Sequence, residues 1–222
     1  MLVGVLAVAS ASCAASGTSE RVAAPARDVA AGKRPAVGRE DAVRVIASAM
    51  TDEQLVGQLV MTRTASARLS GDERAVLRRG GLTGYILFGW NDTGAGSVQQ
   101  VASSIAEQGI TIRVGGVRYR IGGLVAADQE GGSIRALPSQ PPLRSQMSWG
   151  ASQPGELERS SRAAGRVLRR AGVTINLAPV ADLPVGPRRV MSTRSFGARP
   201  AAWVNASVRG FEQGGVAATV KH

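Results

Sequence analysis

The sequence has very few of the residues that form disulfides and metal centres. Among its 222 residues it has one cysteine, Cys13, and one histidine, His222. A single cysteine excludes a disulfide within the chain and a zinc site built from several cysteines, and a single histidine excludes a histidine-rich metal centre. The composition therefore excludes these two kinds of metal centre.

Long apolar runs and aromatic residues are also scarce. No apolar run reaches the ~18 residues of a membrane-spanning helix, and Phe, Trp and Tyr together make up 4% of the chain. Lys and Arg exceed Asp and Glu by 27 to 16, a net charge of +11, but the arginines occur singly or in pairs. Because nucleic-acid grooves combine basic side chains with stacking aromatics, we expect no nucleic-acid partner. Attraction to an anionic cell-wall or membrane surface stays open as an alternative.

The first 40 residues have the pattern of an export leader followed by a tether. An apolar run and then small residues lead to Cys13, as in secretory signals and in bacterial lipoprotein signals, where the cysteine receives the lipid. No basic residue precedes Arg21, and Ser10 stands where a lipoprotein signal usually has leucine. Residues 16–40 favour a flexible tether. We expect a leader at 1–15, a lipid on Cys13, export, and membrane contact only through that lipid; an incidental apolar terminus is the alternative.

From residue 41 onward, short apolar runs alternate with amphipathic segments. Apolar residues at helical spacing predict helices, and β-branched runs bounded by glycine predict buried parallel strands. The predicted helices are 41–50, a short helix capped at Thr51, 97–108, 155–171 and 201–213. The predicted strands are 55–61, 84–88, 121–127, 173–178 and 216–220. Strands that alternate with helices indicate βα units and a parallel sheet.

The spacing of these strands indicates how much of a larger fold the chain covers. Successive units take about 40 residues each, so eight units need roughly 320 residues. We therefore expect an α/β fold that is an incomplete (β/α)8 TIM barrel, with its first five βα units in residues 41–222. A five-stranded open sheet is the structural alternative.

Polar side chains follow the last three predicted strands. Because the carboxyl ends of parallel strands meet at one rim, we expect these side chains to converge there. Acids, amides and cations together suit a sugar, whose hydroxyl groups both donate and accept hydrogen bonds. Taken singly, each is also explained as a capping aspartate or a solvated arginine. The residues are Asp128, Gln129 and Glu130, then Asp182 and Arg194, then Lys221 and His222.

Five motifs occur in order along this region. They are GYILFGWN at 84–91, DQEGG at 128–132, NLAPVAD at 176–182, RSFG at 194–197 and ATVKH at 218–222. In this order they resemble family-three glycoside hydrolases, specifically the bacterial β-N-acetylhexosaminidase branch, and the resemblance covers residues 41–222. It implies a (β/α)8 barrel that removes terminal β-linked N-acetylglucosamine with retention, often from cell-wall muropeptides, without cofactor or metal. The β-glucosidase branch is the alternative.

The resemblance implies sugar-binding roles for four strand-end residues. The aspartate would accept hydrogen bonds from hydroxyl groups and the other three would donate them, and such bonds can strengthen as the sugar ring flattens in the reaction. The family usually has an arginine eight residues after this aspartate, where the sequence has Ala136. Arg135 lies one position earlier and is a fifth candidate, brought into place by a shifted loop. The four residues are Asp128, Arg194, Lys221 and His222.

The resemblance places the family's catalytic groups outside this sequence. A retaining glycosidase needs a nucleophile and a group that protonates the leaving oxygen. In the family both come after the motif that begins with Lys221-His222, so we expect no catalytic residue here. We expect the chain to be the amino-terminal part of an enzyme and inactive alone. Asp128 and Glu130 are close in sequence, but nothing places them on opposite sides of a scissile bond. A non-catalytic sugar-binding lipoprotein is the remaining alternative.

Overall fold

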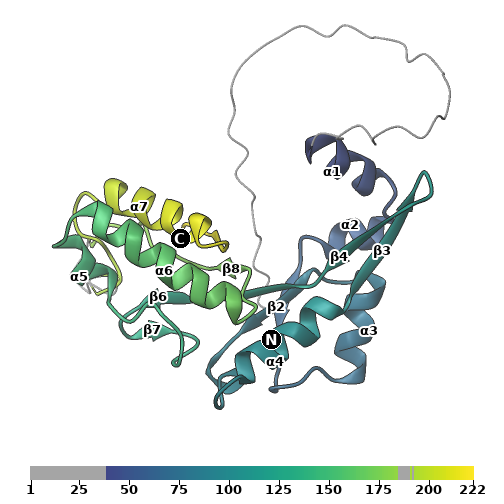
Figure 1. Cartoon of the computed structure of the whole chain (residues 1–222), viewed down its shortest axis with the longest axis horizontal. Coiled ribbons are helices and arrows are strands. Elements are labelled where there is room, and N and C mark those ends of the chain that lie inside the picture. The colour runs from purple at the N-terminus through teal and green to yellow at the C-terminus, as the bar shows by residue number, and fades with distance from the viewer. Residues whose placement is uncertain (1–38, 185–190, 192) are drawn as a thin grey trace, which may run out of the picture.

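The computed structural model describes residues 39–184, 191 and 193–222 (Figure 1). The predicted leader at 1–15, with Cys13, and residues 16–38 of the predicted tether lie outside the described residues. The last two residues of that tether already belong to the first helix, α1 (Arg39–Ser48). Within the described part of the chain, no helix is long and apolar enough to cross a membrane.

The centre of the fold is a sheet of five parallel strands in the order β1-β2-β5-β8-β9. Gly84 of β2 pairs with Leu124 of β5, and a Cβ at Gly84 would lie 1.9 Å from the Leu124 carbonyl oxygen, so only glycine allows this approach. The predicted α/β class with a parallel sheet is confirmed. The strands are β1 (Met61–Arg63), β2 (Gly84–Leu87), β5 (Leu124–Ala127), β8 (Ile175–Asn176) and β9 (Ala217–Ala218).

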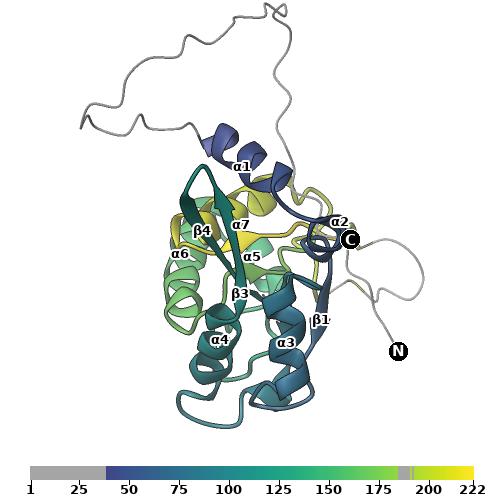
Figure 2. The same cartoon turned by 90° about the vertical axis from the view of Figure 1, so that its right-hand side faces the viewer.

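Helices flank the sheet, and local sequence signals set their ends. They are α2 (Asp52–Gly57), α3 (Gly71–Arg79), the 3-10 turn η1 (Gly89–Asn91), α4 (Ser97–Glu107), α5 (Gln146–Gly150), α6 (Pro154–Arg170) and α7 (Ala201–Gln213). Before α3, the Ser70 hydroxyl accepts from the Glu73 N–H at 3.1 Å and the Glu73 carboxylate accepts from the Ser70 N–H at 2.7 Å. The helix ends at Gly80, whose φ is 83°. Figure 2 shows α3 and α4 next to one another below the hairpin of β3 (Gly109–Val114) and β4 (Val117–Gly122).

The two faces of the sheet bury different residues, because successive side chains of a strand point to opposite faces. On the face that the helices cover, called the outer face below, Tyr85 and Leu87 pack in one apolar cluster with residues of α3, α4, α6 and α7. Burial on both faces is typical of a parallel sheet and explains why its strands have continuous apolar sequences. The inner face carries a smaller cluster of Met61, Ile86, Ala126 and Leu177.

The predicted first strand at 55–61 is wrong over most of its length. Residues 52–57 form α2, where Thr51 and Gln54 make a reciprocal capping box, and β1 begins only at Met61. The capping box satisfies the first N–H groups of the helix, so the chain continues as a helix before it extends. Leu55 is therefore helical.

The predicted third strand at 121–127 is wrong in its first part. Residues up to Gly122 belong to β4 (Val117–Gly122), which pairs antiparallel with β3 (Gly109–Val114). Gly115 and Gly116 form the turn with φ of 53° and 77°, a conformation that favours glycine. Only residues 124–127 join the parallel sheet, and the unpredicted hairpin projects from the body of the molecule (Figure 1).

A second hairpin, also not predicted, follows β5 directly. β6 (Gln129–Gly131) pairs antiparallel with β7 (Ile134–Arg135). Gly131 and Gly132 form its turn with φ of 101° and 61°, and a Cβ at Gly131 would lie 2.2 Å from the Arg144 carbonyl oxygen. The hairpin therefore packs closely against the segment before α5, which fixes the direction of the chain beyond β5. Helix α3, the short helix α5 and the turn η1 are further elements that the sequence did not predict.

Candidate functional site

The structure brings six of the seven polar residues predicted at strand ends, all but Gln129, together at one rim of the sheet. Asp128 directly follows β5, and Lys221 lies beyond β9, where it forms a parallel β-bridge with Val180. Asp128 and Lys221 are 93 positions apart in the chain, yet their side chains touch. The set called the rim cluster below is Asp128, Glu130, Asp182, Arg194, Lys221 and His222.

Lys221 joins two carboxylates. Its Nζ lies 2.5 Å from Asp128 Oδ1 and 2.8 Å from Glu130 Oε1. These two acids reach the same ammonium because residues two apart on extended chain point to the same side. The Asp128 side chain is 32% exposed and that of Glu130 only 1%. The outer carboxylate is therefore open to a ligand, whereas the inner one is closed off by protein.

Arg194 forms a bidentate ion pair with Glu130. Its Nε donates to Oε2 at 2.8 Å and its Nη2 donates to Oε1 at 2.6 Å. Burial by itself would raise the pKa of Glu130, but the hydrogen bonds and charges of Arg194 and Lys221 lower that pKa below its ordinary value. The same hydrogen bonds raise the pKa of the Arg194 guanidinium. Glu130 and Arg194 are therefore both ionised at neutral pH.

His222 lies between an acid and a guanidinium. Its Nδ1 is 2.5 Å from Asp182 Oδ2, and its Nε2 is 3.4 Å from Arg194 Nη2. A ring nitrogen that faces a carboxylate carries the proton, so Nε2 of the neutral ring is left as an acceptor. The Ser195 hydroxyl donates to the Asp182 carbonyl at 2.7 Å and ties the two motifs together. The imidazole, half exposed, is thereby oriented at the rim.

Two buried amides fix the backbone beneath the cluster. The Asn176 side chain accepts from the Gln129 N–H at 3.1 Å and donates to the Gln129 carbonyl at 3.0 Å, which ties β8 to β6. The Gln129 side chain points away from Lys221, donates to the Leu137 carbonyl at 3.2 Å and accepts from the Leu137 N–H at 2.7 Å. Asp128 and Glu130 are therefore held on either side of a residue whose polar groups are all engaged.

Arg135 does not join the rim cluster. Its Nε donates to the Gly132 carbonyl and its Nη1 to the Pro138 carbonyl, both at 3.1 Å. Ala136 packs against the outer apolar cluster, and its N–H donates to the Asp128 carbonyl at 2.8 Å. The Arg135 guanidinium is thus held by carbonyl groups of its own hairpin and of the segment that follows it, and a sugar-binding role for Arg135 stays a prediction.

Glu130 and Asp182 were expected at this rim from the sequence, but they are the members of the cluster to which the sequence gave no sugar-binding role. Both lie within the quoted motifs, and the carboxylate two residues after Asp128 was the signal for Glu130. That signal alone did not distinguish a ligand-binding acid from a buried one, because exposure depends on Arg194 and Lys221, which come from other strand ends.

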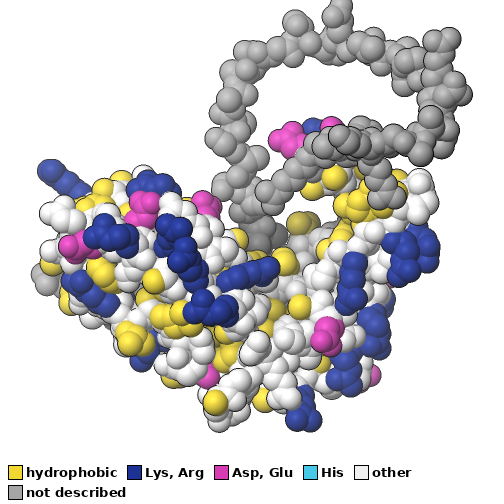
Figure 3. Space-filling view, in the orientation of Figure 1, with side chains coloured by type: hydrophobic (Ala, Val, Ile, Leu, Met, Phe, Trp, Pro, Cys, Tyr) yellow, Lys and Arg dark blue, Asp and Glu magenta, His cyan; other side chains and the backbone are white. Residues whose placement is uncertain are grey.

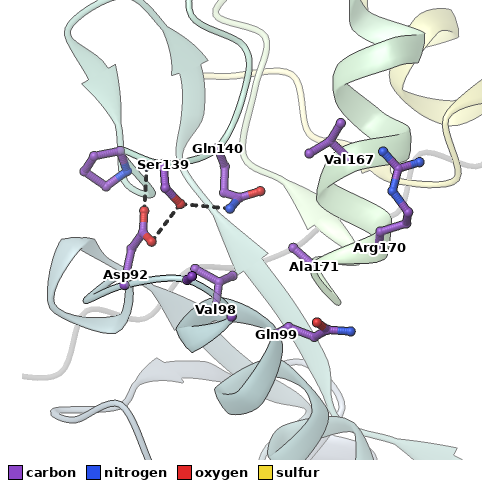
Figure 4. A pocket seen from close by; sticks show the side chains of 12 residues that line it. Asp92, Val98, Gln99, Ser139, Gln140, Val167, Arg170 and Ala171 are labelled. Atoms are coloured by element: carbon purple, nitrogen blue, oxygen red, sulfur yellow. Dashed lines mark hydrogen bonds between the residues drawn. The ribbon is translucent and has the colours of Figure 1, made fainter.

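A cavity of about 820 Å³ lies away from the rim cluster, between α4, α6 and the loop after β7 (Figure 4). Its carboxylate, Asp92, accepts from the Ser139 N–H at 2.7 Å and from the Ser139 hydroxyl at 2.8 Å. None of the residues of the rim cluster lines this cavity. Since charged groups from several strand ends converge at the rim, the rim is the better candidate site.

On the face in Figure 3, basic side chains occur in several groups separated by uncharged and apolar surface. Among residues 39–184, 191 and 193–222, no group of three or more His, Cys, Asp or Glu is arranged to hold a metal ion.

Comparison with known proteins defines the class of protein. Residues 50–222 match the N-terminal domain of glycosyl hydrolase family 3. This match includes the whole parallel sheet and every residue of the rim cluster. The chain therefore belongs to glycosyl hydrolase family 3.

The relatives indicate the branch within that family. A β-hexosaminidase of Stenotrophomonas maltophilia (strain K279a) is 31% identical over 175 residues, which are 74% of this chain and 49% of the relative. The β-N-acetylhexosaminidase of Beutenbergia cavernae DSM 12333 has a TM-score of 0.62 at 28% identity, over 78% of this chain and 54% of that one. A family 3 β-N-acetylglucosaminidase from Paenibacillus sp. str. FPU-7 has a TM-score of 0.67 at 29% identity, over 78% and 33%. The chain is of the β-N-acetylhexosaminidase branch and spans about half the length of the curated relatives it matches.

Proposed function

We propose that this chain is the sugar-binding, amino-terminal part of a retaining β-N-acetylhexosaminidase that removes terminal β-linked N-acetylglucosamine from cell-wall glycans or muropeptides. The observation that carries the proposal is the convergence of Asp128, Arg194, Lys221 and His222 at one rim. We also propose that its fold is the first five βα units of a (β/α)8 barrel. The sequential strand order and the small apolar cluster on the inner face support this reading.

The chemistry of the rim cluster matches that of a hexosamine. Asp128 offers an exposed carboxylate that accepts from hydroxyl groups, while Lys221 and Arg194 offer cationic donors. The donors and the acceptor lie within one network. Adjacent hydroxyl groups of one sugar ring, which both donate and accept, therefore fit this network better than a ligand with a single charged group. The names of the related enzymes support N-acetylglucosamine over glucose as the ring.

Bond cleavage is proposed to depend on groups other than those of the rim cluster. Asp128 and Glu130 contact the same ammonium, so they lie on one side of any ligand, and Glu130 is buried beneath it. A retaining mechanism needs two groups that reach a glycosidic bond from different positions. We propose that these groups belong to the half of the related enzymes that this chain does not cover.

Sugar binding is tested by ligand-observed NMR with N-acetylglucosamine and the 222-residue chain. We expect binding that Asp128→Ala abolishes and that glucose competes for poorly. A signal of equal strength for both sugars would favour the β-glucosidase branch. Equal binding by the variant would remove the rim cluster from the proposal.

Turnover is tested with a chromogenic β-N-acetylglucosaminide. We expect no release of the aglycone above the blank by the purified chain. Release that Asp128→Asn abolishes would contradict the proposed division between binding and cleavage.

The location of the protein is proposed from the sequence alone. We propose export to the cell envelope with a lipid on Cys13, and no partnership with nucleic acid. Metabolic labelling with a radioactive fatty acid should mark the wild-type chain and not Cys13→Ser. A duplex-DNA titration at low salt should give a flat response.

A further inference from the structure

Glu130 is the member of the rim cluster that a ligand cannot reach. Its side chain is 1% exposed, and both of its oxygens are occupied by cations. Oε2 accepts from Arg194 Nε at 2.8 Å, while Oε1 accepts from Arg194 Nη2 at 2.6 Å and lies 2.8 Å from Lys221 Nζ. A carboxylate in this position acts on the two cations and not on a sugar.

We propose that Glu130 is a positioning residue for sugar recognition: it holds the Lys221 ammonium and the Arg194 guanidinium so that their remaining donors face the rim. This inference rests on the proposed function of the rim cluster. It adds a residue whose effect on binding is transmitted wholly through other side chains.

The count of donors shows how the positioning works at Lys221. An ammonium has three hydrogens. The ion pairs with Asp128 and Glu130 direct two of them, one to the exposed acid and one to the buried acid. Two fixed N–H directions also fix the direction of the third N–H. The ammonium can then donate to a ligand hydroxyl without first losing rotational freedom. Without Glu130, the long side chain keeps only its contact with the partly exposed Asp128.

The same argument applies to Arg194. Glu130 takes Nε–H and one hydrogen of Nη2, which sets the plane of the guanidinium. Nη1 lies 3.7 Å from Met191 Sδ, and Nη2 lies 3.4 Å from His222 Nε2. The other edge of the guanidinium is thus left at the rim beside His222. A lysine at this position has no second point of attachment and cannot be oriented in the same way.

Charge balance gives Glu130 a second effect. Arg194 and Lys221 both approach Oε1, so their positive charges lie close together and repel one another. The buried carboxylate between them offsets that repulsion. Hydrogen bonds from both cations lower its pKa against the effect of burial, so the carboxylate is ionised at neutral pH.

The test compares Glu130→Gln with Glu158→Gln. Glu158 also accepts from Nε and Nη2 of an arginine, Arg209, but it lies on the surface between α6 and α7. The first readout is the dissociation constant for N-acetylglucosamine. It is measured under conditions in which circular dichroism shows that each protein is folded. We expect Glu130→Gln to weaken binding by about tenfold or more, the effect of a lost charged hydrogen bond, and Glu158→Gln to leave binding unchanged.

The second readout needs no sugar. The sequence has two lysines, Lys33 and Lys221. Amine modification followed by mass spectrometry therefore reports on Lys221, with Lys33 in the same sample as the reference for reagent dose. Lys221 is 17% exposed and held by two acids, so we expect Glu130→Gln to raise its modification rate relative to Lys33 and Glu158→Gln to leave the ratio unchanged.

The outcomes separate the inference from the proposed function. Wild-type affinity in folded Glu130→Gln would overturn the positioning role while sugar binding stands. No binding by the wild-type chain would overturn the proposed function, and the Lys221 ratio then decides the inference: an unchanged ratio overturns it and a raised ratio supports it. If Glu130→Gln does not fold, Glu130→Asp, which keeps the charge but shortens the reach, is judged by the same two readouts.

Discussion

Two arginine–glutamate pairs in this molecule have the same charges and different surroundings. At the rim, Arg194 spans both oxygens of Glu130, whose side chain is 1% exposed. Between α6 and α7, Arg209 donates from Nε and Nη2 to a single oxygen of Glu158, at 3.0 and 2.9 Å. There the arginine and glutamate side chains are 55% and 26% exposed.

Exposure, more than geometry, decides what such a pair does. Hydrogen bonds from the arginine lower the pKa of the glutamate in both cases. Water screens the surface pair and competes for its hydrogen bonds, so it contributes little to folding. At the rim, removal of one partner leaves a poorly solvated charge, which is strongly unfavourable. The buried pair thus acts as a fixed part of the site, and the surface pair is dispensable.

The largest expected effect comes from Glu130→Ala. It leaves Arg194 without its bidentate partner and Lys221 with Asp128 alone, and we expect a loss of about 3–5 kcal/mol in the free energy of unfolding. Urea unfolding followed by circular dichroism measures it. A loss below about 1 kcal/mol, the range of surface pairs, would contradict the expectation that the buried pair contributes more to stability than the surface pair.

A smaller effect is expected for Arg194→Lys, compared with Arg209→Lys as its matched control. An ammonium cannot span both oxygens of Glu130, so we expect a loss of about 1–3 kcal/mol at the rim, the value of a hydrogen bond to a charged group. The surface variant should unfold with the wild-type midpoint. Equal losses of stability in the two variants would show that the bidentate geometry of the Arg194–Glu130 pair contributes no more than the surface contact does.

Acid should weaken the rim pair. The pKa of Glu130 lies below its ordinary value of 4.5 in the folded chain, so the unfolded chain takes up the proton first. The contribution of Glu130 to stability is complete above that ordinary value and is lost as pH falls through the lower, folded-state pKa. We expect the free energy of unfolding to fall more steeply below pH 4.5 in the wild type than in Glu130→Gln. Glu158 is present in both proteins, so its contribution to the pH dependence cancels. If the free energy of unfolding depended on pH in the same way in both proteins, the lowered pKa of Glu130 would be contradicted.

The smallest expected effect is that of Glu158→Gln. Its amide still accepts from Arg209, and water replaces what is lost. We expect no measurable shift in the urea midpoint and no change in the binding of N-acetylglucosamine. A clear loss of stability would mean that the contact between α6 and α7 depends on this pair.

The fold could be predicted wherever local sequence signals agreed with the tertiary context. The runs at 84–88 and 173–178, each bounded by a turn and followed by a helix, indicated buried parallel strands, and the structure has β2 and β8 within them. The prediction failed at 55–61, where the capping box of Thr51 prolonged a helix. It failed again at 121–127, because an apolar run does not show where a hairpin ends and a parallel strand begins.

The site was predictable in composition and only partly in arrangement. The sequence determined which polar residues end the strands and, since parallel strands share one edge, that Asp128, Arg194 and Lys221 meet there. Only the tertiary structure decided that Glu130 is buried and Asp128 exposed. Both acids point to the same side of the extended chain, and their exposure is set by cations from distant strand ends, whose contacts no local pattern encodes.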